Sequence, residues 1–123
     1  MTSIQPVTVP GAAVLGTWHS HTWDNGINLT ELAAFDRVFV RTRNSLYEII
    51  VSSPGSGDVL VRGGEFFPEF TTARVAGATL GGSFLKLRSI HIGFRLEFTL
   101  GQRFVLTSPV ETIDVATDVT VSG

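Results

Sequence analysis

Residues 90–100 read Ile-His-Ile-Gly-Phe-Arg-Leu-Glu-Phe-Thr-Leu, and this stretch decides the fold. Every second residue is apolar, and the residues between them are polar or glycine. Side chains alternate across a β-strand, so this period of two predicts one buried face and one solvent face. A helix would scatter the same apolar residues around its circumference. The stretch is long for a single strand, and Gly93 is expected to bend it.

The same alternation predicts a three-stranded meander over residues 37–62. The expected strands are 37–43, 46–52 and 58–62. The turn at 54–57 is Pro-Gly-Ser-Gly, in which proline presets φ and glycine accepts a positive φ. The residues expected to point inward are Val38, Val40, Thr42, Tyr47, Ile49, Val51, Val59 and Val61.

The remaining segments are shorter, and glycine or proline separates them. Further strands are expected at 71–76, 84–87, 103–107 and 110–115, with turns at 77–83 and 101–102. Pro68 places 65–70 at an edge or in a loop. The only helical segment expected is Thr30 to Phe35, with Thr30 as its N-cap. The sequence therefore predicts an all-β fold, a compact antiparallel β-barrel or barrel-like sandwich of about seven to nine strands with at most one short helix.

The length of 123 residues indicates one domain, spanning 1–123. The end segments, 1–10 and 116–123, are expected as loose tails, and for the second the alternative is pairing with the strand edge of a neighbouring molecule. There is no cysteine, which excludes disulfides, thiolate metal sites and a cysteine nucleophile. With no targeting or membrane-spanning segment in view, we expect a cytoplasmic protein without a membrane partner.

Charged residues are scarce, at 16% of the chain against about 25% in ordinary domains. With so few charged residues, part of the surface must be apolar. We therefore expect another copy of the chain to cover part of that surface. The formal net charge is −2, which is too balanced for a protein that holds nucleic acid mainly by neutralising phosphates.

The most unusual segment lies between Trp18 and Trp23. His19 and His21 are two residues apart, so on a strand both would point the same way, and Asp24 would complete a three-ligand set for zinc or another divalent metal. The alternative is a turn at 24–26, with the histidines on a solvent face between two packed tryptophans. Motifs this short match often by chance, and the alternative is the favoured interpretation.

A second group of residues shares one face of the expected strand 37–43. Arg37, Arg41 and Arg43 lie beside Phe39 on that face. Arginine with an aromatic is one mark of single-stranded nucleic-acid binding, but it is also enriched where subunits meet. Given the net charge, we favour a ligand or subunit interface, to which Trp18 and Trp23 are assigned as well.

Four short sequence segments, in this order along the chain, carry a resemblance: residues 41–47 (RTRNSLY), 59–64 (VLVRGG), 81–83 (GGS) and 107–110 (TSPV). In this the chain resembles short bacterial all-β proteins of the conserved hypothetical type, over roughly residues 37–113. The resemblance implies no activity, cofactor or catalytic residue, and it does not include the His19 region.

The leading hypothesis is a non-enzymatic binding or assembly module that acts as a homo-oligomer and needs no cofactor. It follows from the low charge and from the lack of any specific catalytic motif. The alternative is a small, cupin-like metal-dependent or ligand-binding enzyme that uses His19, His21 and Asp24. A further alternative is nucleic-acid binding through the face of Arg37, Arg41 and Arg43.

Overall fold

A computed structural model describes residues 16–23, 25–81 and 84–120, with the backbone alone at 16–23, 81 and 118–120. Strands and one short 3-10 turn make up its regular structure. These elements are β1 (Gly16–Trp23), β2 (Gly26–Asn28), η3 (Leu29–Glu31), β3 (Arg37–Thr42), β4 (Leu46–Ser53), β5 (Asp58–Gly63), β6 (Phe67–Gly81), β7 (Phe84–Leu87), β8 (Ser89–His91), β9 (Arg95–Leu100) and β10 (Arg103–Thr120). No helix in the described part is long and apolar enough to cross a membrane.

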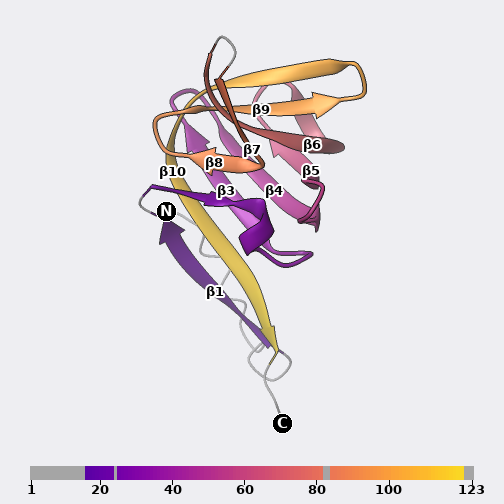
Figure 1. Cartoon of the computed structure of the whole chain (residues 1–123). Helices are drawn as coiled ribbons and strands as arrows, with labels where there is room; N and C mark the ends of the chain where they lie inside the picture. The colour runs from indigo at the N-terminus through magenta and orange to yellow at the C-terminus, as the bar shows by residue number, and fades with distance from the viewer. Residues whose placement is uncertain (1–15, 24, 82–83, 121–123) are drawn as a thin grey trace.

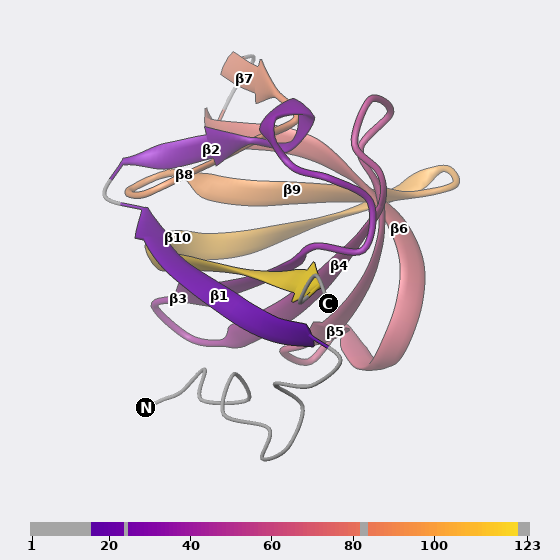
Figure 2. The same ribbon diagram turned by 90° about the horizontal axis from the view of Figure 1, so that it is seen from below.

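Six strands close into a ring of antiparallel pairs (Figures 1 and 2). Going round the ring, β3 pairs with β4, β4 with β5, β5 with β6, β6 with β9, β9 with β10, and β10 with β3. Two further strands lie outside this ring, β1 beside β10 and β7 beside β6. The all-β, barrel-like prediction is confirmed, and closure gives each of the six ring strands a neighbour on both sides.

The last strand, β10, links three neighbours along its length. Its first part pairs with β9, its middle with β3, and its last part with β1. Residues 116–120 therefore continue the strand and pair with β1, which runs with the end of β10 away from the barrel in Figure 1. The predicted interruption at Ser108 and Pro109 is a register shift within the strand.

The deciding stretch, 90–100, is not one strand, and this part of the prediction was wrong. It divides into β8 and β9 with a turn between them. Gly93 has a φ of 89°, and its N–H donates to the carbonyl oxygen of Val110. This φ lies in the left-handed region that favours glycine, so the chain turns there where only a bend was expected. Within β9 the alternation is confirmed, since Leu96 and Phe98 are fully buried while Arg95 is exposed, whereas Ile92 and Phe94 before it are only half-buried.

The core fills the ring, and the predicted meander supplies much of it. All the residues predicted to point inward are buried: Val38, Val40, Thr42, Tyr47, Ile49, Val51, Val59 and Val61. Phe67 and Phe98 pack edge to face with their ring centroids 5.3 Å apart, and Tyr47 lies 6.0 Å from Phe98. Such offset aromatic pairs add to the stability from buried area alone.

The short pair of β2 and β8, together with η3, adds Ile27, Leu29 and Ile90 to the same core. The predicted helix from Thr30 is a single 3-10 turn, and its N-cap is Asn28. The Asn28 side chain accepts a hydrogen bond from the Thr30 N–H, while its own backbone N–H donates to Glu31. This reciprocal cap gives hydrogen-bond partners to the backbone N–H groups at the start of the turn. The chain becomes extended again at residue 32.

The strand β6 continues through Pro68 and Gly77, the two positions at which the sequence predicted breaks, and both predictions were wrong. Pro68 is accommodated where the register with β5 shifts, so 65–70 is partly strand. Gly77, predicted to begin a turn, lies inside the strand with a φ of 151°. A Cβ atom there would be 2.1 Å from the Lys86 carbonyl oxygen. This glycine therefore allows a close backbone approach within the sheet. The predicted strand 84–87 and the turn at 101–102 are confirmed.

Candidate functional site

The predicted metal segment lies mostly in β1, along the outer part of β10. The register places Trp18 opposite Asp118, His19 opposite Thr117, His21 opposite Val115 and Trp23 opposite Ile113. Asp24 lies outside the described residues. Within the described part, no three histidine, aspartate or glutamate residues lie together as metal ligands would. The metal set of His19, His21 and Asp24 stays a prediction.

The arginine group lies where the alternation placed it. Arg37, Phe39 and Arg41 alternate along β3 with buried valines and so lie on the outer face of the sheet, and Arg43 is exposed in the turn that follows. Arg37 forms an ion pair with Glu48 of the neighbouring strand β4.

Two more arginines, which sequence reasoning missed, extend this outer face across β5 and β6. Arg62 donates to Glu48 at 2.7 Å and stacks on the ring of Phe70, 4.3 Å from its centroid. Arg74 pairs with Asp58 at 2.9 Å. Their outward positions follow from the alternation of β5 and β6, but the strand pairing that joins them to β3 is a tertiary feature. On strands β3 to β6 this face carries more arginines than carboxylates, namely Arg37, Arg41, Arg62 and Arg74 against Glu48 and Asp58.

Three pockets differ in how many of their polar groups already form hydrogen bonds within the protein. The first, about 220 Å³, is lined by Asn25, Gly26, Ile27, Asn28, Glu31, Lys86, Ser89 and His91. Asn28 Nδ2 donates to the Leu87 carbonyl and to Ser89 Oγ, and Glu31 accepts the cap bond from the Asn28 N–H. His91 Nδ1 lies 3.2 Å from a backbone carbonyl. Most of its polar groups therefore hold the β2–β8 end of the fold together.

The second pocket, about 130 Å³, is lined by Asn44, Ser45, Tyr47, Glu65, Phe66, Leu106, Thr107 and Ser108. Its hydroxyl groups form a chain of internal bonds. Ser108 Oγ donates to Thr42 Oγ1 at 2.8 Å, and Thr107 Oγ1 accepts from the Leu96 N–H at 3.0 Å. Desolvation raises the pKa of the Tyr47 phenol above its usual value. The hydroxyl groups of Thr107 and Ser108 therefore form hydrogen bonds that stabilise the barrel.

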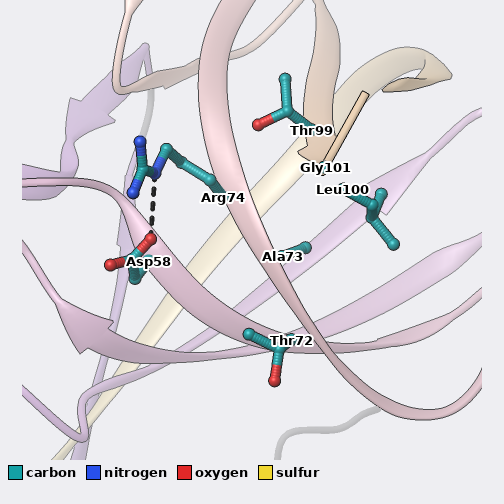
Figure 3. A pocket seen from close by; sticks show the side chains of 7 residues that line it. All are labelled: Asp58, Thr72, Ala73, Arg74, Thr99, Leu100 and Gly101. Carbon is teal, nitrogen blue, oxygen red and sulfur yellow. Dashed lines mark hydrogen bonds and ion pairs between the residues drawn. The ribbon is translucent and has the colours of Figure 1, made fainter. Parts of the chain in front are cut away.

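The third pocket is the largest of the three, about 330 Å³, and lies across β5, β6 and β9 (Figure 3). It is lined by Asp58, Thr72, Ala73, Arg74, Thr99, Leu100 and Gly101. Asp58 accepts from Ser56 Oγ at 2.8 Å and from Arg74 Nε at 2.9 Å. These bonds, from Ser56 first and from Arg74 second, lower the pKa of the Asp58 carboxyl group.

The hydrogen-bonding groups left over distinguish this third pocket from the other two. Among the described residues, nothing bonds to the terminal Nη groups of Arg74 or to the hydroxyls of Thr72 and Thr99. They are therefore available to a ligand.

An apolar surface lies on the hairpin of β6 and β7, outside the ring. Leu80 is 64% exposed, Phe84 49% and Leu87 57%. No residue of β7 is buried, and β7 is the last strand of its sheet, so its outer edge has no described strand beside it. The strand 84–87 was predictable from its residues but its exposure was not, because alternation does not reveal which strand ends a sheet.

No protein-family model, curated protein or solved structure matches the chain. No family is therefore assigned. Function has to be inferred from the outer arginine face, the third pocket and the apolar hairpin.

Proposed function

We propose that the protein is a non-enzymatic assembly module that acts as a homo-oligomer, with the hairpin of β6 and β7 as its contact surface. The observation that carries this proposal is the exposure of Leu80, Phe84 and Leu87 around an edge strand. Large apolar side chains on an unpaired strand edge favour association, because both backbone groups and apolar area gain partners there.

The composition of β7 supports contact through its edge. Natural proteins protect strand edges with charged residues, proline or bulges. Of the four residues of β7 only Lys86 is charged, and the others are Phe84, Leu85 and Leu87. Burying a large apolar side chain completely contributes about 1.5–3 kcal/mol, so a few such residues can drive a stable contact.

A second copy of the chain is the partner that this edge fits. Two β7 strands related by a two-fold axis pair antiparallel around one central residue. Centring on Leu85 places Leu85 opposite its own copy and Phe84 opposite Lys86, whose aliphatic stem packs on an aromatic ring. Centring on Lys86 would place two like charges opposite each other, which is unfavourable. The register centred on Leu85 is therefore the proposed one.

Cysteine cross-linking tests this register, because the natural chain has no cysteine. Opposite residues of an antiparallel pair lie about 4.5–5.5 Å apart at Cα, within the range that a disulfide spans. Leu85→Cys is expected to give a disulfide-linked dimer under mild oxidation. The control, Ser52→Cys, is expected to stay monomeric in denaturing electrophoresis, because Ser52 is exposed but lies in β4, which has strands on both sides. Equal cross-linking of the two variants would contradict the register.

Light scattering coupled to size exclusion tests the association itself. Wild-type protein is expected to be oligomeric at micromolar concentration, and Leu80→Glu is expected to shift it to monomer. Phe104→Glu is the matched control, since Phe104 is 66% exposed but lies on β10, away from this hairpin. A monomeric wild-type protein would remove the proposal.

A further inference from the structure

We propose that the third pocket is an anion site that binds a carboxylate or a phosphate group, with Arg74 as its main ligand. The site lies on the outer surface of β5, β6 and β9 and does not involve the apolar hairpin. The inference is therefore independent of the assembly function.

The side chain of Arg74 is held in place by a carboxylate that is itself held. Arg74 Nε donates to one oxygen of Asp58, and Ser56 Oγ donates to the other. Figure 3 shows the guanidinium group of Arg74 directed toward Asp58. Because a guanidinium group is planar, a bond at Nε restrains the plane that contains both Nη groups. Asp58 is thus a positioning residue for a two-pronged donor.

The backbone register explains why these groups meet. Arg74 lies opposite Asp58 on one side of β6 and opposite Thr99 on the other. Residues directly opposite in an antiparallel pair share a face, so Asp58, Arg74 and Thr99 all face the pocket. The Nη groups of Arg74 and the Thr99 hydroxyl bond to no described residue. The Arg74 fork can hold two oxygens of a carboxylate or a phosphate, and the Thr99 hydroxyl offers a further donor on the neighbouring strand, on the other side of the Arg74 side chain from Asp58 in Figure 3.

Along β3 to β6 the charge favours an anion over a cation, and β9 adds Arg95 and Glu97, of opposite charge, to the face that carries Thr99. Arg62 and Arg74 share the outer face with Arg37 and Arg41, and the two carboxylates of β4 and β5, Glu48 and Asp58, are both already paired with arginines. In contrast, the polar side chains of the two smaller pockets mainly bond to one another or to the backbone. The volume of about 330 Å³ is at the lower end of the range for small-molecule sites. The site therefore fits one small anionic group.

Titrations with inorganic phosphate and with acetate, at constant ionic strength set by sodium chloride, test the proposal by two-dimensional NMR of backbone amides. We expect saturable shifts at residues 58, 72–74 and 99–101, and the tighter of the two anions identifies the preferred chemistry. Arg74→Gln is expected to weaken binding by about tenfold or more, and Arg74→Lys by a smaller factor, since lysine keeps the charge but loses the fork. Arg62→Gln, a matched arginine on the same face, is expected to change affinity by less than about twofold.

Asp58→Ala separates positioning from simple charge. If net charge alone governed binding, removal of a carboxylate would tighten it. If Asp58 holds Arg74 in place, the same change weakens binding of both anions, and this is the result we expect. Equal affinities in wild-type protein and Arg74→Gln, or shifts spread evenly over all surface arginines, would overturn the site. Thermal unfolding of each variant checks that it is folded, which we expect because the side chains of Arg74 and Asp58 are 57% and 41% exposed and neither belongs to the core.

Discussion

The two consecutive hairpins β4–β5 and β6–β7 contrast sharply in how they use apolar residues. In β4 and β5, buried and more exposed positions alternate, and every buried side chain joins the core. In β7 no position is buried, although three of its four residues are apolar. In sequence β7 resembles β4 and β5, because all three are short strands rich in apolar residues.

The difference teaches what closure of the barrel does to a strand. β4 and β5 lie within the ring, so each has one inner face to fill. β7 pairs with residues 77–81 of β6, beyond the part of β6 that pairs with β5, so β7 continues the sheet where the ring strand β5 has ended. Phe84 packs against Phe94, with ring centroids 5.8 Å apart, but Phe84 and Leu87 keep about half of their surface exposed. We propose that this remaining apolar surface contacts another copy.

The largest expected effect comes from truncating one aliphatic side chain in each hairpin. Ile49→Ala in β4 is expected to lower the free energy of unfolding by about 2–5 kcal/mol, because Ile49 is fully buried and a cavity would remain. Leu87→Ala in β7 is expected to change it by less than about 0.5 kcal/mol under dilute, monomeric conditions. Urea unfolding monitored by circular dichroism measures both. Similar losses for the two variants would break the comparison.

The next largest effect is expected from replacing one glycine in each hairpin with alanine. Gly77→Ala is expected to destabilise the protein by more than about 1 kcal/mol, because the new Cβ would meet the Lys86 carbonyl oxygen and the φ is positive. Gly55, in the turn between β4 and β5, has no atom within 4 Å of such a Cβ. Gly55→Ala is expected to be neutral or to stabilise slightly. Melting temperatures of the pair test this, and an unchanged melting temperature for Gly77→Ala would count against the close approach.

The smallest expected effect is a pH dependence confined to β4. Burial raises the pKa of Tyr47 above 10.0, so the folded state favours the neutral phenol. The stability that this contributes is complete below pH 10, the unfolded value, and is lost as pH rises through the higher folded value. Tyr47→Phe is expected to flatten the fall in stability at alkaline pH, as measured by urea unfolding at a series of pH values. β7 contains no tyrosine, so it should contribute nothing to this pH dependence of stability.

The inner residues of β3 to β5 were predictable because period-two alternation is a local property of an extended chain. The split of 90–100 at Gly93 was not, since it depends on hydrogen bonds with Val110, a residue distant in sequence. Gly77 was misassigned for a related reason. Glycine permits both a turn and a close approach within a sheet, and only the position of Lys86 distinguishes the two.

The candidate sites show the same division. Arg37, Phe39 and Arg41 were found from one strand, because one strand sets their common face. The pocket of Asp58, Arg74 and Thr99 was missed, because its residues come from three strands that meet only through the pairing of β6 with β5 and β9.

The order of apolar and polar residues by itself determined that the chain folds as antiparallel strands and which side of most strands faces inward, since both follow from geometry between near neighbours. Closure of the ring was decided only in the tertiary structure, and so were the strand left at the edge and the arginine held beside a pocket. Those features depend on contacts between residues far apart in the chain, whose free energies a local pattern does not contain.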